Sequence, residues 1–137
     1  MRGATIGMLV FGAIAVGGCG SAAHFADRPH PPTPVNLTVY ISSSRVSVSP
    51  SSVGAGPVAF IITNQASSAV TLTVRGAGGG SALATTAPIN PQATSSLSLD
   101  LRQGDYSIAG AGASSIAPAS LHVGRSRGNG NNALLQP

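Results

Sequence analysis

Alternation of apolar and polar side chains is the feature that most constrains how this chain can fold. Over residues 35–41, valine, leucine, valine and isoleucine alternate with asparagine, threonine and tyrosine. Successive side chains of an extended strand point to opposite faces, so this pattern predicts a strand with one buried face. The same period of two predicts further short strands at 46–48, 58–62, 70–74, 97–101, 106–108 and 119–123, and residues 83–87, between a glycine-rich turn and Pro88, are expected to form another. Beyond the N-terminal segment, no stretch has the 3.6-residue spacing of an amphipathic helix.

Turn-forming residues separate the expected strands. The chain has 18 glycines and 10 prolines, and many serines and threonines, which favour turns and short connections. Seven or eight short strands without helices predict an all-β fold, an antiparallel Greek-key β-sandwich over residues 35–124. A domain of this size buries only about two-thirds of the surface that its unfolded chain exposes, and one cysteine allows no internal disulfide. The core must come from the aliphatic rows, because Phe60 is the only phenylalanine in this range.

The first 19 residues have the features of an export signal. Arg2 precedes an apolar run over residues 6–16. This run is shorter than the about 20 residues that span a membrane and has the length of a signal-peptide core. The run ends in Val16-Gly17-Gly18-Cys19, which resembles the bacterial lipoprotein signal, or lipobox: an aliphatic residue, two small residues and a cysteine. We therefore expect residues 1–18 to be a lipoprotein signal peptide, removed in front of Cys19.

The lipobox resemblance implies that Cys19 is the lipid attachment site. Its thiol would accept a diacylglyceryl group, and its freed α-amino group would take a further acyl chain such as palmitate, which together give stable anchoring. An ordinary secretory signal with a chance cysteine and an uncleaved anchor are the alternatives. A lone free thiol would be unusual in an exported protein, which favours lipidation. The expected location is the extracytoplasmic face of the cell membrane, with membrane lipid as the partner of Cys19.

Residues 19–34 are expected to form a lipid-anchored, proline-rich linker. Four prolines between positions 29 and 34 favour an extended polyproline II conformation, which would hold a domain away from the lipid headgroups. His24, Asp27 and His30 could bind a metal weakly, but a metal site needs ligands in a fixed geometry, and a solvated linker is the simpler interpretation. At the other end, residues 125–137 are rich in glycine and asparagine and predict a disordered tail.

Three segments of the expected sandwich carry a family resemblance. Residues 49–60 read SPSSVGAGPVAF and are followed by Thr63-Asn64, residues 89–92 read INPQ, and residues 101–108 read LRQGDYSI. In this order and spacing they resemble the cupredoxin-like domains of exported bacterial proteins. The third segment departs from the family pattern at Gln103, where the family has proline.

The resemblance also implies where copper ligands would stand. Cupredoxins that bind copper use two histidines, a cysteine and usually a methionine, a ligand set that suits copper. The family pattern puts the first histidine at Ala69 or Val70, the cysteine at Gly110, and the remaining two ligands within residues 111–120, which read AGASSIAPAS. None of these residues can bind copper. We therefore expect a cupredoxin-like sandwich with no metal site and no cofactor.

Composition argues against two other function classes. All seven basic residues are arginines scattered along the chain, and aromatic residues make up 4% with no tryptophan. The clustered basic residues and stacking surface of a nucleic-acid-binding protein are therefore missing. Residues 35–124 offer Asp100, Asp105 and His122, with no evident partner for either aspartate, and no glutamate, cysteine or lysine. Because catalysis needs a paired nucleophile and base or paired carboxylates, we expect no enzyme and no catalytic residue.

Two polar residues of the sandwich are given structural roles. Alternation places His122 on the face of the last strand opposite Leu121 and Val123, so it should face solvent. Tyr106 follows a glycine turn, and we expect it at a corner of the sandwich with its hydroxyl bonded to the backbone.

Two functions remain. The first is a membrane-anchored exported lipoprotein whose copper-free sandwich is a binding or envelope-structural module, with its ligand or protein partner unidentified. The second is an accessory protein in extracytoplasmic metal or redox handling, which would use the ligands of a partner or His24 and His30 of the linker.

Overall fold

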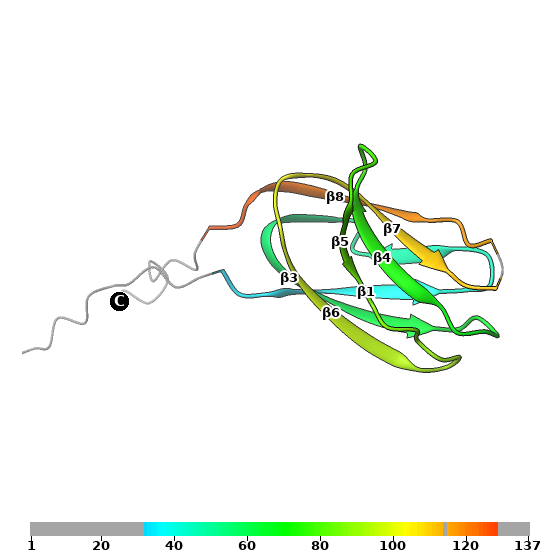
Figure 1. The fold of residues 1–137 in the computed structure, drawn as a ribbon. Helices are drawn as coiled ribbons and strands as arrows, with labels where there is room; N and C mark the ends of the chain where they lie inside the picture. Colours follow the sequence, from blue (N-terminus) through cyan, green and yellow to red (C-terminus); the bar gives the residue numbers. More distant parts are fainter. Residues whose placement is uncertain (1–31, 114, 129–137) are drawn as a thin grey trace, which may run out of the picture.

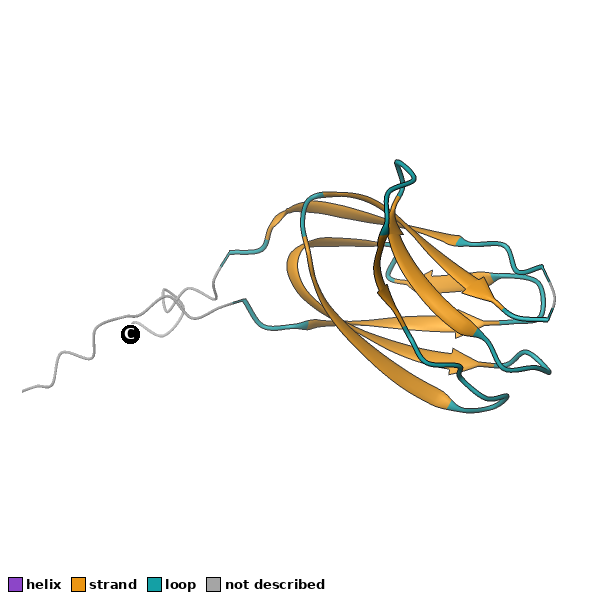
Figure 2. Cartoon of the chain, viewed as in Figure 1, coloured by secondary structure: helices purple, strands orange, loops and turns teal. Residues whose placement is uncertain are grey.

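The computed structural model describes residues 32–113 and 115–128, and over these ranges the chain contains strands and no helix (Figure 1, Figure 2). The strands are β1 (Val35–Ile41), β2 (Val46–Ser49), β3 (Ser52–Asn64), β4 (Thr71–Gly76), β5 (Ala82–Thr85), β6 (Thr94–Leu101), β7 (Gly104–Ala111) and β8 (Ala119–Ser126). The all-β prediction is confirmed. The largest difference is β3, a continuous strand of 13 residues that includes a glycine-rich segment expected to form a turn.

One connected sheet folds at β3 into two layers. The C-terminal part of β3 pairs with β1 on one side and β6 on the other, and β2 extends this layer beyond β1. The N-terminal part of β3 pairs with β8, which is followed in order by β7, β4 and β5. The strand orders are therefore β2-β1-β3-β6 and β3-β8-β7-β4-β5, and the two layers face each other in Figure 1.

The sheet is mixed, so the prediction of an antiparallel sandwich is wrong in this respect. The C-terminal part of β3 runs parallel to β1, and its N-terminal part runs parallel to β8, whereas the other ladders are antiparallel. The reason lies in the path of the chain: β2 folds back along the outer edge of β1, and the chain then returns to pair on the other side of β1. After two reversals β3 has the direction of β1. Apolar alternation is the same in parallel and antiparallel strands, so it does not reveal this difference.

The apolar rows of both layers meet in one buried core. Phe60 is its largest side chain with no solvent exposure. The fully buried side chains around it come from six strands and from the residue before β4: Leu37, Val39 and Ile41 of β1, Val58 and Ile62 of β3, Val70 just before β4, Leu72 and Val74 of β4, Leu101 of β6, Ile108 of β7, and Leu121 and Val123 of β8. Burial of these side chains at about 25 cal/mol per Å² of apolar surface is the main favourable contribution to folding.

The leucine row of β6 is less buried than its alternation suggests. Leu101 is buried, but Leu97 and Leu99 are only partly covered. β6 pairs with β3 and with no other strand, so it forms an edge of its layer, and one side of its apolar row lacks a neighbour. Alternation therefore identifies the inward face of a strand correctly, while the depth of burial depends on the position of the strand in the sheet.

A bend in β3 is held by the arginine that follows β8. The register between β3 and β8 shifts at Gly54, and Gly56 has a φ of 130°, a conformation that L side chains rarely adopt. The Arg127 side chain lies across this bend and donates hydrogen bonds to the carbonyl oxygens of Ala55 and Pro57. A Cβ atom on Gly54 would come within 2.6 Å of the Arg127 Cγ. The two glycines thus provide both the bend and the space for the arginine.

Both ends of the described chain leave the sandwich on the same side. Arg127 Nη1 donates to the carbonyl oxygen of Thr33 at 3.0 Å, which ties the segment before β1 to the segment after β8 (Figure 1). β8 itself extends to Ser126, two residues past the boundary at 124 expected from the sequence. We call this side of the sandwich the termini end.

We expect Phe60→Ala to lower the free energy of unfolding by about 3–5 kcal/mol, because it removes the largest fully buried side chain of the core. Ile61→Ala is the matched control, since Ile61 is the next residue of the same strand and is 40% exposed on the outer face. The control should change stability by about 0.5 kcal/mol or less. Urea unfolding followed by circular dichroism measures both. Equal losses at the two positions would contradict the assignment of inner and outer faces.

Candidate functional site

Connections between strands gather at the side of the sandwich opposite the termini end, which we call the loop end. They are residues 42–45, 65–70 and 86–93, and the β7–β8 connection around Ile116. Backbone hydrogen bonds tie these connections together. The N–H of Val46 donates to the carbonyl oxygen of Ala117 at 2.8 Å, and the N–H of Ala117 donates to that of Ser44 at 2.8 Å. Val70 and Ile89 exchange two backbone hydrogen bonds, at 3.0 and 2.9 Å. The positions that the family pattern assigns to copper ligands lie here.

Asn64 organises the loop end from inside. It is the only buried polar or charged residue of the described chain, with no solvent exposure. Its Nδ2 donates to the carbonyl oxygens of Ser68 at 2.9 Å and Ile89 at 2.8 Å, and its Oδ1 accepts from the backbone N–H of Ala66 at 2.9 Å. One side chain therefore satisfies backbone groups of two loops, which accounts for a buried amide in an otherwise apolar core.

Apolar side chains fill the position where the family pattern has a cysteine. A Cβ atom on Gly110 would lie 3.2 Å from Val70 Cγ1 and 3.4 Å from the nearest methyl groups of Ile116 and Val46. Val70, Val46 and Ile116 are 1%, 4% and 9% exposed. A thiol at position 110 would need more room than a Cβ and would have to displace these side chains. The space beside Gly110, near the C-terminal end of β7, is therefore filled by tight apolar packing.

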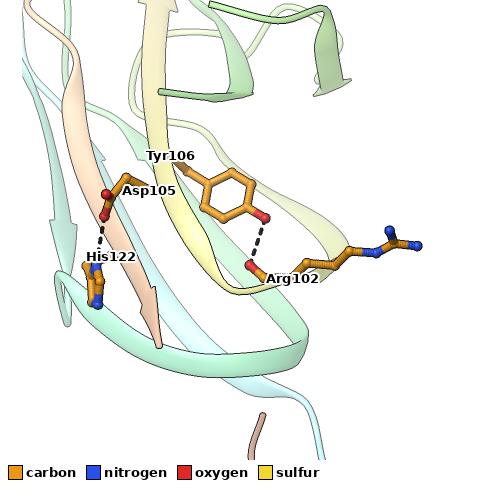
Figure 3. Close-up of polar contacts among 4 residues, drawn as sticks. All are labelled: Arg102, Asp105, Tyr106 and His122. Carbon is orange, nitrogen blue, oxygen red and sulfur yellow. Dashed lines mark hydrogen bonds and ion pairs between the residues drawn. The ribbon is translucent and has the colours of Figure 1, made fainter. Parts of the chain in front are cut away.

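Tyr106 has the structural role expected of it. Its side chain is buried, and its hydroxyl donates to the carbonyl oxygen of Arg102 at 2.8 Å (Figure 3). The bond spans the turn between β6 and β7, where the chain passes from one layer to the other. It therefore fixes a corner of the sandwich, and Gln103 lies within the turn that it closes.

His122 and Asp105 form a pair that sequence reasoning missed. The His122 Nδ1 lies 2.7 Å from the Asp105 Oδ1, so the imidazole donates through Nδ1 to the carboxylate (Figure 3). Their side chains are 62% and 70% exposed, which confirms that His122 faces solvent. The two residues are opposite each other in the β7–β8 register. A register is not visible in alternation alone, so only the turn length between these strands could have suggested the pair.

Other residues considered from the sequence do not join a site. Asp100 is exposed on the outer face of β6. Within the described ranges, no group of three or more histidine, cysteine, aspartate or glutamate residues could hold a metal ion. Cys19, His24, Asp27 and His30 lie outside the described residues.

Comparison with known proteins adds no relative: no protein-family model and no curated protein matches this chain. In the part of the chain that the structure describes, no helix has the length and apolar character needed to cross a bilayer.

We expect Asn64→Ala to lower the free energy of unfolding by about 3 kcal/mol or more, because the buried partners of the amide lose their hydrogen bonds, at about 1–3 kcal/mol each. Asn36→Ala, on the exposed face of β1, should stay within about 0.5 kcal/mol of the parent. Hydrogen exchange of the Ala66 amide should speed up only in the Asn64 variant. Unchanged exchange at Ala66 would show that the amide does not order this loop.

We expect Gly110→Val to destabilise the domain by about 1–3 kcal/mol, the usual cost of adding volume to a filled interior. Gly80→Val makes the same change in the β4–β5 connection, where a Cβ would meet nothing within 4 Å, and should cost about 0.5 kcal/mol or less. Thermal unfolding of the two variants measures the difference. A Gly110 variant as stable as the Gly80 variant would mean that the loop end has room for a larger side chain.

Proposed function

We propose that this chain is an exported lipoprotein, anchored through acylated Cys19 to the extracytoplasmic face of the cell membrane. Its β-sandwich serves as a binding or envelope-structural module. The sandwich has a cupredoxin-like arrangement without copper, and its role is not catalytic.

The observation that carries this proposal is the contact between Thr33 and Arg127 at the termini end. The linker that follows a lipid-bearing Cys19 would join the sandwich at this end. The loop end then lies on the side away from the attachment point (Figure 1). This is the arrangement that a tethered module needs if its loops are to meet a partner outside the membrane.

The positions of two of the family-like segments support the cupredoxin-like arrangement. The segment SPSSVGAGPVAF covers the bend at which β3 passes from one layer to the other. The segment LRQGDYSI covers the β6–β7 turn that Tyr106 closes. Both segments therefore fall where the chain crosses between layers, and such crossings require particular backbone conformations and turn residues.

The filling of the loop end supports a role without copper or catalysis. Val70, Ile116 and Val46 occupy the space around Gly110, and the amide of Asn64 is fully used in backbone hydrogen bonds. The exposed residues of the loops are mainly serine, alanine, glycine, glutamine, asparagine and proline. Such a surface can contact a partner but supplies no thiolate, imidazole or carboxylate.

The Cys19 assignment makes a direct prediction in a lipoprotein-processing host. Intact-mass analysis of the membrane fraction should give a chain that starts at residue 19 and carries diacylglyceryl and a further acyl chain. Cys19→Ala should remain an uncleaved precursor or leave the membrane fraction, because no other thiol exists in the chain. Cys19→Ser is the conservative control and should behave like Cys19→Ala, since its hydroxyl is a far weaker nucleophile than a thiolate. A cysteine-free variant that is processed and retained like the parent would disprove the anchor.

A further inference from the structure

We propose that the termini end of the sandwich is a docking surface for anionic lipid headgroups, through the exposed side chains of Arg102 and Arg125. This inference rests on the proposed lipid anchor and adds an orientation to it. The domain would lie with its termini end against the membrane surface and its loop end turned away.

The fold brings the arginines to one place. Leu101 pairs with Gly56 at the bend of β3, and Arg102 follows it directly. Arg127 lies across the same bend, and Arg125 is the residue at which the β3–β8 register shifts. Arg102 and Arg125 are exposed. Residues far apart in the sequence thus gather where the chain leaves the sandwich.

These positive charges are not matched by carboxylates. Among the described residues, the one contact of salt-bridge length joins His122 to Asp105, and no arginine lies that close to a carboxylate. Arg127 is held by carbonyl oxygens alone, so its charge also remains. Asp100 and Asp105 lie on the outer faces of β6 and β7 near this end. They reduce the local charge without reversing it.

The loop end carries fewer charged residues. Its described connections contain Arg45 and no acidic residue. Arg102, Arg125 and Arg127 against Asp100 and Asp105 leave the termini end at +1, the same net charge that Arg45 gives the loop end. The ends therefore differ in the number of arginines, and in which of them the tether would hold beside the bilayer. Arg45 provides an internal reference within the same molecule.

Anionic lipid fits this surface better than another partner because the chain itself would hold the surface beside the bilayer. Each basic side chain near an anionic membrane strengthens attraction by about fivefold. Two exposed arginines would give weak binding to a free domain. For a tethered domain the same attraction is enough to select one orientation, because the tether already supplies a high local concentration.

The experiment tests orientation without relying on acylation in a cell. The chain from residue 19 to residue 137 contains all eight strands and a single thiol. After its β-sheet circular dichroism spectrum has been checked, Cys19 is coupled to a maleimide lipid in vesicles of phosphatidylcholine, with or without phosphatidylglycerol. A dicarbonyl reagent then modifies exposed arginines, and peptide mass spectrometry gives the rate at each position.

On vesicles with phosphatidylglycerol, Arg102 and Arg125 should react at least about fivefold more slowly than on neutral vesicles, while Arg45 reacts at the same rate on both. High salt should abolish the protection, because it screens charges separated by more than a few ångströms. In the double variant R102Q/R125Q, hydrogen exchange at the β6–β7 turn should lose its dependence on anionic lipid. The R45Q variant should keep it.

If the rate at each of the three arginines is the same on both kinds of vesicle, the docking surface is overturned. Protection of Arg45 in place of Arg102 and Arg125 would also overturn it. Protection that is the same on neutral vesicles would also overturn it, because the contact would then not depend on charge. Since the tether is made chemically, these results are separate from the mass analysis of Cys19. Either proposal can fail while the other stands.

Discussion

The structure depends on one strand that belongs to two layers. β3 pairs with β1 and β6 through its C-terminal part and with β8 through its N-terminal part, so the layers are joined by continuous backbone and not by side-chain packing alone. The bend that makes this possible needs Gly54 and Gly56, and the Arg127 side chain closes it. In a domain without a disulfide, such a link helps to keep two small layers in register around an aliphatic core.

The loop end is filled by apolar side chains and tied together by one buried amide. β7 still arrives beside the loop after β3, but Gly110 is surrounded by the methyl groups of Val70, Ile116 and Val46. The buried side chain of Asn64 connects two of the surrounding loops through hydrogen bonds to their backbone. Apolar packing thus fills the space around Gly110, and a single buried amide satisfies backbone groups of two of the loops.

The two ends of the sandwich have different physical characters, and this polarity links the fold to the proposed role. Arg102, Arg125 and Arg127 gather where the chain enters and leaves, while the described connections of the loop end have Arg45 as their one charged residue. A tethered domain needs little intrinsic affinity for a surface beside it, because the tether supplies the local concentration. Modest charge at one end can therefore set which end a partner meets.

The sequence by itself determined that this chain is a strand protein, which residues face inward, and that His122 faces solvent, because these follow from local periodicity. It also supplied the role of Tyr106, since a tyrosine after a glycine turn has few other places for its hydroxyl. The parallel direction of β3, the partial exposure of Leu99 at an edge, the pairing of His122 with Asp105 and the position of Arg127 were decided only by the tertiary structure. Each of these depends on which strands become neighbours and in what register, and alternation along one strand contains no information about its neighbours.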